Sequence, residues 1–121
     1  MRLLVVEDDD GIAEPLVAGL RREGFDVDRV ATGAAALAAP EPDMVLLDLR
    51  LPDMDGYAVA RAIRETLTDD VAHKLRLVAV TGYGQDRDRA KALAAGFDAH
   101  VVKPVNADGI FRAITGPREE T

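Results

Sequence analysis

Acidic side chains directly follow two short apolar runs of the sequence, at positions where buried strands would end. The run at 3–6 is followed by Glu7 and Asp8, and the run at 44–47 is followed by Asp48. Carboxylates held within a few ångströms repel one another unless a cation lies among them. An all-oxygen ligand set with room for water is typical of Mg²⁺ rather than of a softer metal. The three acids therefore predict a Mg²⁺ site, provided that the fold brings the two strand ends together.

Two later apolar runs end in polar side chains of a different kind. Thr81 follows the run at 75–80, and Lys103 follows the run at 99–102. A carboxylate can accept a phosphoryl group as a nucleophile, and such a transfer depends mainly on positioning and on neutralising the equatorial oxygens. We predict Asp48 as the nucleophile, with Mg²⁺, the Thr81 hydroxyl and the Lys103 ammonium each holding one phosphoryl oxygen.

The elements that must position these groups can be predicted from the apolar pattern. Continuous apolar runs without alternation are typical of strands buried on both faces of a parallel sheet. We predict five strands, at Leu3–Val6, Val27–Ala31, Met44–Leu47, Leu75–Val80 and Ala99–Val102.

Helical spacing, capping residues and glycine stops predict five helices, one after each strand. The first would end before Gly24, with Asp9 and Asp10 capping its start, and Pro15 favours a start no earlier than Gly11. The others are predicted at 34–39, 57–66 with Asp55 as its cap, 88–95, and after Asn106.

This alternation predicts a single doubly wound α/β domain, (βα)5, with a five-stranded parallel sheet in the order 2-1-3-4-5, as in flavodoxin-like folds. Ligands bind such sheets at the carboxyl edge where the strand order reverses, here between the first and third strands. Glu7, Asp8 and Asp48 would converge there, with Thr81 and Lys103 beside them.

Composition limits the classes of function. The 121 residues carry a net charge of −7 and no cysteine. An acidic surface disfavours nucleic acid and anionic membranes as partners, and a chain without cysteine has no thiolate metal site. No apolar run approaches the length of a membrane span. We expect a cytoplasmic protein with its domain at 1–116, a polar tail at 117–121 and no membrane insertion.

Four motifs, in order along nearly the whole chain, resemble the receiver domain of two-component response regulators. They are LVVEDD at 4–9, VLLDLRLPDMDG at 45–56, VAVTG at 78–82 and VVKP at 101–104. The resemblance implies a phosphoacceptor domain of a phosphorelay that assists its own phosphorylation and dephosphorylation and is otherwise not an enzyme.

The resemblance also implies roles for single residues at the acidic site. Asp48 would be the phosphoacceptor, charged by the phosphohistidine of a cognate histidine kinase or phosphotransfer protein. Asp8 would ligate Mg²⁺ directly, Glu7 mainly through water, and Arg50 through its backbone carbonyl. Arg50 and Tyr83 occupy positions that tune the rate at which water removes the phosphoryl group.

Further implied roles lie at the later strands. Thr81 would be the switch hydroxyl, Lys103 would pair with the phosphoryl group, and the bond before Pro104 would be cis. Gly82 would leave the phosphoryl site accessible. His100 departs from the family pattern, because the switch position three residues before the lysine is usually Tyr or Phe.

The resemblance implies that the signal leaves through a surface formed by the fourth helix, the fifth strand and the fifth helix, toward a downstream protein. Homodimerisation is left open. The stretches at 81–85 and 96–100 are similar to receivers at the C-terminal end of hybrid histidine kinases, so the chain is either such a module or a stand-alone regulator.

Two other functions are alternatives. A haloacid dehalogenase-type hydrolase also uses an aspartate, Mg²⁺, a threonine and a lysine, but its nucleophile follows the first strand and has a second aspartate two residues on, where this chain has Arg50. A receiver-like docking domain that is never phosphorylated would not need Asp8, Asp48, Thr81 and Lys103 together.

Overall fold

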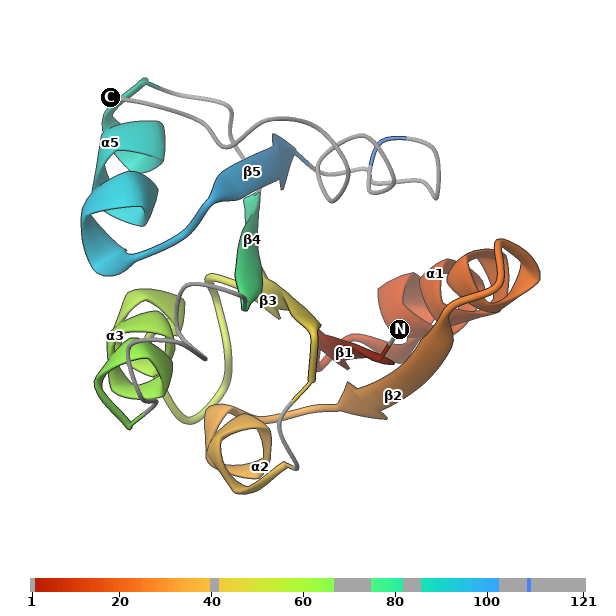
Figure 1. Cartoon of the computed structure of the whole chain (residues 1–121). Helices are drawn as coiled ribbons and strands as arrows, with labels where there is room; N and C mark the ends of the chain where they lie inside the picture. The colour runs from red at the N-terminus through yellow and green to blue at the C-terminus, as the bar shows by residue number, and fades with distance from the viewer. Residues whose placement is uncertain (1, 40–41, 67–74, 82–85, 103–108, 110–121) are drawn as a thin grey trace.

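The computed structural model describes residues 2–39, 42–66, 75–81, 86–102 and 109 (Figure 1). Strands and helices alternate through this part of the chain. They are β1 (Arg2–Val6), α1 (Asp10–Arg22), β2 (Asp26–Val30), α2 (Gly33–Ala38), β3 (Met44–Asp48), α3 (Gly56–Thr66), β4 (Arg76–Thr81), α5 (Asp86–Ala95) and β5 (Ala99–Val102).

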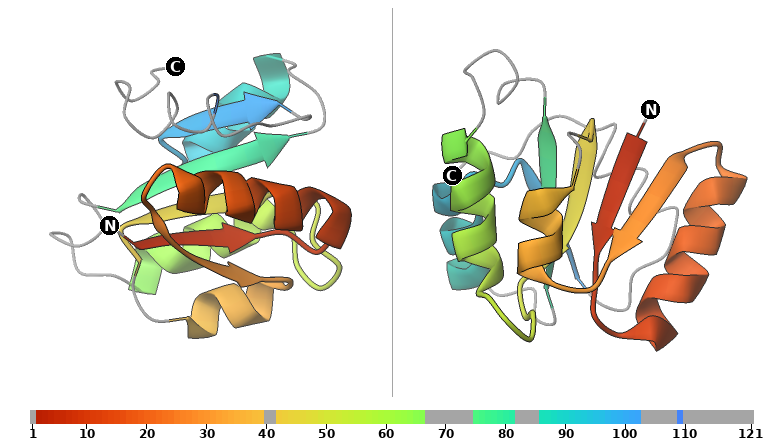
Figure 2. Two further views of the ribbon diagram at one scale, coloured as in Figure 1. Left: turned by 90° about the vertical axis from the view of Figure 1, so that its right-hand side faces the viewer. Right: turned by 90° about the horizontal axis from the view of Figure 1, so that it is seen from below.

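The strands form one parallel sheet in the order β2-β1-β3-β4-β5, which confirms the predicted order (Figure 2). Residues 3–6 of β1 lie beside residues 44–47 of β3 in register. These two strands are neighbours although a helix, a strand and a second helix separate them in the sequence. The strand order therefore reverses beside β1, and the carboxyl ends of β1 and β3 meet there.

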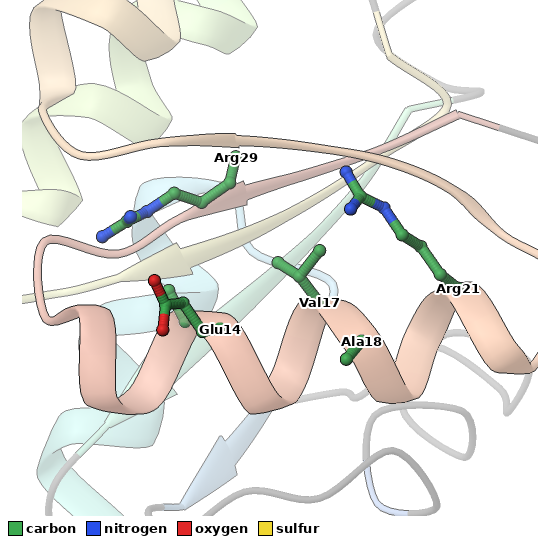
Figure 3. A pocket seen from close by; sticks show the side chains of 6 residues that line it. Glu14, Val17, Ala18, Arg21 and Arg29 are labelled. Atoms are coloured by element: carbon green, nitrogen blue, oxygen red, sulfur yellow. The ribbon is translucent and has the colours of Figure 1, made fainter.

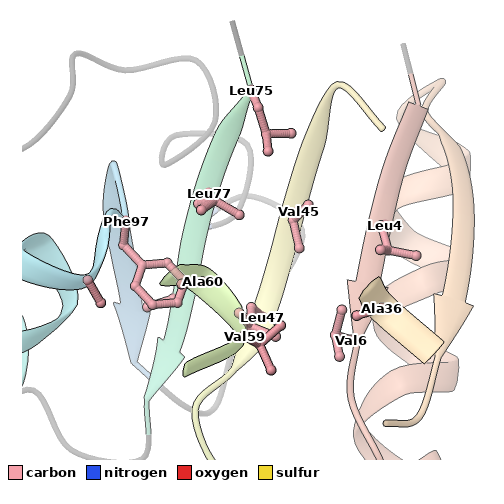
Figure 4. Close-up of a cluster of buried hydrophobic side chains, with 12 residues drawn as sticks. Leu4, Val6, Ala36, Val45, Leu47, Val59, Ala60, Leu75, Leu77 and Phe97 are labelled. Carbon is pink, nitrogen blue, oxygen red and sulfur yellow. The ribbon is translucent and has the colours of Figure 1, made fainter. Parts of the chain in front are cut away.

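Helices cover both faces of the sheet, so β1 and β3 are buried on both sides. On one face, Leu3 and Val5 of β1 pack in a cluster with Leu16 and Leu20 of α1. On the other face, residues of β1 and β3 pack against α2, α3 and α5 (Figure 4). This burial explains the continuous apolar runs, because neither face of these strands meets water.

Helix α1 begins one residue earlier than predicted. The Asp9 carboxylate accepts the Gly11 N–H at 2.8 Å, and the Asp9 carbonyl accepts the Ala13 N–H at 2.8 Å. This cap starts the helix at Asp10 and places Pro15 inside it. The early start costs one backbone hydrogen bond, because Pro15 has no N–H to donate within the helix. The predicted stop is confirmed, since Gly24 has a positive φ of 96°.

A buried ion pair fastens the amino-terminal edge of the sheet. Arg64 of α3 donates to the Asp98 carboxylate at 2.9 Å, and the same carboxylate accepts the backbone N–H of Leu77 at 2.9 Å. Arg64 also donates to the carbonyls of Leu75 and Gly96. These bonds join the end of α3 to the starts of β4 and β5, at the edge opposite the acidic residues.

The predicted helix after Asn106 and the predicted tail at 117–121 lie outside the described residues. Among the helices that the structure describes, none is both long and apolar enough to cross a bilayer.

Candidate functional site

Glu7, Asp8 and Asp48 meet at the carboxyl edge of the sheet, as predicted. One carboxylate oxygen from each lies within 4.8 Å of the other two. Glu7 and Asp48 are buried, with 4% of each residue exposed, whereas Asp8 is exposed. Asp48 is the last residue of β3, and Glu7 comes directly after β1. The cluster is therefore open to solvent on the Asp8 side and walled by the sheet on the other.

Backbone N–H groups hold two of these carboxylates. The N–H of Asp8 donates to Oε2 of Glu7 at 3.1 Å, and the N–H of Arg50 donates to Oδ1 of Asp48 at 3.0 Å. Each carboxylate is thus oriented by the peptide group one or two residues further along the chain. Such bonds favour the ionised form of a carboxylate, and so does a bound cation.

The loop after Asp48 is tied back to the sheet and to α3. The N–H of Leu49 donates to the Val80 carbonyl at 3.3 Å, and the N–H of Gly56 donates to the Leu49 carbonyl at 3.1 Å. Arg50 and Asp55 form an antiparallel bridge. The Asp55 carboxylate accepts the N–H of the second residue of α3 at 2.9 Å, which confirms its predicted capping role.

Gly56 allows the start of α3 to approach the end of β3 closely. A Cβ atom at this position would lie 2.5 Å from Cα of Leu49 and 2.8 Å from the Asp48 carbonyl oxygen. Both neighbours are backbone atoms, so neither can move without moving the loop that begins at Asp48. The close approach of the two backbone segments therefore requires a glycine at this position.

Asp53 joins the same loop to α2. Its carboxylate accepts the N–H of Gly33 at 2.8 Å and the N–H of Ala34 at 3.0 Å. These two bonds, the one from Gly33 first, hold the pKa of Asp53 below its ordinary value of 3.8. The Thr32 hydroxyl accepts a third N–H of the same helix start. Asp53 was not predicted as part of the site, and it fixes the loop that carries Arg50.

The remaining predicted site residues are placed only in part. Thr81 ends β4, and its neighbour Val80 lies beside Asp48 in register, so the backbone puts Thr81 at the acidic edge. His100 lies in β5 opposite Ala79 and is half-buried.

Other residues to which the resemblance gives roles lie outside the described residues. They are Gly82, Tyr83, Lys103 and Pro104.

The donor set of the cluster fits Mg²⁺. All three side chains offer carboxylate oxygens, two of them from a buried wall and one from the open side. A hard divalent cation that keeps several water molecules is bound by such a set, with few protein ligands and access to solvent. Thiolate and imidazole ligands, which softer metals prefer, are absent from this cluster.

A pocket of about 250 Å³ lies between α1 and β2, beside the turn from β1 to α1 that carries Glu7 and Asp8 (Figure 3). We call this turn the acidic turn. Its walls are largely apolar, and two arginines contribute to them. The lining residues are Ala13, Glu14, Val17, Ala18, Arg21 and Arg29.

The structure defines a doubly wound α/β domain with three clustered acids at the switch point of its sheet, and comparison with known proteins identifies the family. Residues 3–115 match the response regulator receiver domain, so the chain belongs to that family. It is a receiver domain of two-component systems, in a family that signals rather than catalyses. With Asp48 at the end of β3 rather than β1, the hydrolase alternative is not supported.

Curated relatives agree with this assignment. The transcriptional regulatory protein AfsQ1 of Streptomyces coelicolor is 37% identical over 127 residues, which cover 98% of this chain and 54% of AfsQ1. The DNA-binding response regulator MtrA of Mycolicibacterium smegmatis is 40% identical over 106 residues, covering 85% of this chain and 44% of MtrA. The chain thus spans about half the length of the curated relatives it matches.

Solved structures show the same fold. The CheY-like receiver domain protein of Methanospirillum hungatei superposes with a TM-score of 0.79 at 29% identity, covering 93% of this chain and 89% of that one. Response regulator DrrB of Thermotoga maritima gives 0.81 at 30% identity, covering 93% of this chain and 50% of DrrB. CheY4 of Vibrio cholerae gives 0.83 at 22% identity, over 93% and 94% of the two chains, and supports the fold alone.

Proposed function

We propose that Asp48 is the phosphoacceptor of this receiver domain. The observation that carries the proposal is the position of Asp48, buried at the end of a central strand with oxygens of Glu7 and Asp8 within 4.8 Å. A buried carboxylate beside two others is costly unless the site binds a cation. A cation there also offsets the negative charge that a phosphoryl group brings.

The transfer would proceed by attack of an Asp48 carboxylate oxygen on the phosphorus of a phosphohistidine. The new O–P bond forms as the P–N bond breaks, and the electron pair of the P–N bond returns to the imidazole of the partner. The Arg50 N–H, 3.0 Å from Oδ1, orients the Asp48 carboxylate for this attack. The product is an acyl phosphate, which water can hydrolyse.

We propose Mg²⁺ as the metal, held directly by Asp8 and Asp48, through water by Glu7, and by the Arg50 carbonyl. Bound there, Mg²⁺ would neutralise charge on the phosphoryl oxygens. The receiver would thereby assist its own phosphorylation and dephosphorylation.

The roles implied for the later strands are part of the same proposal. Thr81 would bind one phosphoryl oxygen and Lys103 another, with a cis bond before Pro104. His100 would act as the switch residue that reports the state of Thr81 to the surface. A half-buried position on β5, one strand from Thr81, supports this role for His100.

For partners, we propose a cognate histidine kinase or phosphotransfer protein, and a downstream protein that binds the surface around α5, β5 and the helix predicted after Asn106. A second copy of this chain is a further candidate partner. The domain would occupy residues 1–116, with a tail at 117–121, and act in the cytoplasm. The names of AfsQ1 and MtrA describe transcriptional regulation and DNA binding. With a net charge of −7, these 121 residues are not proposed to bind nucleic acid themselves.

Incubation with acetyl phosphate and Mg²⁺, followed by mass spectrometry, tests the proposal. We expect one added phosphoryl group in the wild type, none in Asp48→Ala, and an unchanged yield in Asp28→Asn, a control aspartate on β2. Omission of Mg²⁺ should abolish the adduct. A folded wild-type protein that gains no phosphoryl group would show a docking domain instead, and an adduct retained in Asp48→Ala would place the phosphoacceptor elsewhere.

A further inference from the structure

Arg29, on the edge strand β2, reaches the turn that carries two of the clustered acids. Its Nε and Nη2 atoms both donate to the backbone carbonyl of Glu7, at 2.9 and 2.8 Å. Its third nitrogen, Nη1, forms an ion pair with Asp10 at 2.6 Å. The arginine side chain is 25% exposed. One guanidinium therefore binds both ends of the β1–α1 turn, through the Glu7 carbonyl just before Asp8 and through the Asp10 carboxylate at the first residue of α1.

The hydrogen bonds from Arg29 to the Glu7 carbonyl also affect a hydrogen bond inside the acidic cluster. The Glu7 carbonyl and the Asp8 N–H belong to the same planar peptide group and point in opposite directions. When Arg29 holds the carbonyl toward β2, the N–H is directed away from β2. That N–H donates to Oε2 of Glu7 at 3.1 Å. Rotation of this peptide would break both contacts and release the Glu7 carboxylate from the hydrogen bond that orients it.

We infer that Arg29 is a positioning residue for the acidic cluster, which orients Glu7 and Asp8 for the divalent cation through the shared peptide group. The inference rests on the proposed function, because it assumes that the cluster binds Mg²⁺. Nothing in the receiver motifs assigns Arg29 a role, since those motifs lie at other strands.

Arg21 provides an internal comparison (Figure 3). It lies in α1 at the other end of the same pocket, and its Nη2 donates to the backbone carbonyl of Val27 at 2.9 Å. Both arginines therefore have the same chemistry, bind a carbonyl and line one pocket. Only Arg29 binds the turn that carries the acids, so only Arg29 should affect the metal.

Two properties of the Arg29 side chain can affect the binding of a cation: the positive charge of its guanidinium and the planar arrangement of its N–H donors. A positive charge beside the cluster opposes the binding of a cation, whereas correct orientation of the acids favours it. Arg29→Lys keeps the charge but loses the planar fork, because an ammonium cannot present two parallel donors and a third in one plane. This substitution therefore tests positioning alone.

Calorimetric titration with MgCl₂ is the decisive measurement, with Arg21→Lys as the matched control. We expect Arg29→Lys to weaken Mg²⁺ binding by about 10-fold, the lower end of the loss seen when groups that orient metal ligands are changed. Arg21→Lys should stay within about twofold of the wild type. Equal affinities in all three proteins would overturn the inference and leave the proposed function intact. A wild type that binds no Mg²⁺ would instead refute the proposed metal site.

Amide hydrogen exchange without Mg²⁺ gives a second readout that global destabilisation would not mimic. In Arg29→Lys the Asp8 amide should exchange faster while Leu46, in the middle of β3, is unchanged. Proportional acceleration at both positions would indicate a merely structural role and overturn the inference.

A second pair of variants applies if Arg29→Lys fails to fold. Asp10→Asn and Glu14→Gln each remove one negative charge from the start of α1, but of these two side chains the structure bonds only Asp10 to Arg29. Asp10→Asn should weaken Mg²⁺ binding more than Glu14→Gln, and equal effects would contradict the role assigned to Arg29.

Discussion

Removal of the Asp48 charge should stabilise the protein in the absence of metal. Asp48 shares its site with Glu7 and Asp8, with oxygens of all three within 4.8 Å. At 4.8 Å, Coulomb's law gives a repulsion of about 0.9 kcal/mol per pair in water and about 3.5 kcal/mol at an effective dielectric constant of about 20. Asp48 takes part in two such pairs. Asp48→Asn removes both repulsions and keeps an oxygen that can accept the Arg50 N–H.

The net gain should be smaller than the sum of the two pairs. Crowded acids relieve repulsion by taking up protons, and the Lys103 ammonium, in its proposed role at this site, would offset part of the charge. We therefore expect Asp48→Asn to raise the free energy of unfolding by about 1–3 kcal/mol at pH 7 in EDTA, or a melting temperature higher by about 4 °C for each kcal/mol.

Asp98→Asn is the matched control, because Asp98 is also a buried aspartate at an edge of the sheet but is paired with a cation. Its carboxylate binds Arg64 at 2.9 Å and the Leu77 N–H at 2.9 Å. Loss of that charge leaves the guanidinium of Arg64, 19% exposed, without its counter-ion, so stability should fall by about 1–3 kcal/mol.

Thermal unfolding followed by circular dichroism would measure both variants. If the three acids repel one another, Asp48→Asn raises the melting temperature and Asp98→Asn lowers it. If Asp48→Asn lowers the melting temperature as Asp98→Asn does, the acids do not repel in the folded protein and the reasoning is wrong. Excess Mg²⁺ should stabilise the wild type by mass action more than it stabilises Asp48→Asn. The difference in melting temperature between the two proteins should therefore be smaller with Mg²⁺ than in EDTA.

Three further predictions concern the loop, α2 and β5. Gly56→Ala places a Cβ atom 2.5 Å from Cα of Leu49, and such overpacking should cost about 1–3 kcal/mol in thermal unfolding; an unchanged melting temperature would contradict the close approach. The lowered pKa of Asp53 means that its stabilisation is complete above its ordinary pKa and is lost as pH falls through the folded value. Urea midpoints should therefore decline less below about pH 4 in Asp53→Asn than in the wild type or in Asp26→Asn, and equal declines would refute this linkage. For β5, where His100 is the proposed switch residue, His100→Ala should leave phosphorylation by acetyl phosphate unchanged but weaken binding of the phosphorylated protein to its partner; unchanged partner binding would remove His100 from the switch.

The strand order and the convergence of the acids were predictable because they follow from topology. Buried parallel strands produce apolar runs that any observer of the sequence can locate, and a doubly wound chain of this length has few strand orders available. Once the order is known, the residues that follow β1 and β3 must meet. Glu7 and Asp48 are therefore placed by the strand ends, without any knowledge of side-chain packing.

The start of α1 was harder to predict, because two local preferences conflict there. Pro15 favours a later start, whereas the Asp9 carboxylate offers a cap to the N–H of Gly11. The structure shows that the cap decides the start, at the cost of one backbone hydrogen bond inside the helix. Sequence rules rank such preferences only weakly against each other, since each contributes about 1–3 kcal/mol.

The residues that hold the acidic turn and the loop could not be predicted from sequence. Arg29 and Asp53 bind backbone groups, a carbonyl at Glu7 and two N–H groups at the start of α2. Every residue carries a backbone carbonyl, and every residue except proline carries an N–H, so no pairing of residue types reveals the contact. Only the folded chain selects which carbonyl a given guanidinium reaches.

Arg29 lies on β2, the edge strand at the opposite end of the sheet from β5. Asp53 lies in the loop after β3 and binds the start of α2. In the proposed function the acids are constrained, because they would contact a cation and a phosphoryl group directly. Arg29 and Asp53 hold the backbone beside these acids, and in the proposed site neither would contact the cation or the phosphoryl group. It follows that receivers with identical acidic residues can differ in metal affinity through substitutions in β2 and in the loop after β3. Exchange of Arg29 alters the turn at Glu7, and exchange of Asp53 alters the loop at Arg50, so their effects on Mg²⁺ affinity should add when both are changed, because the two contacts share no residue.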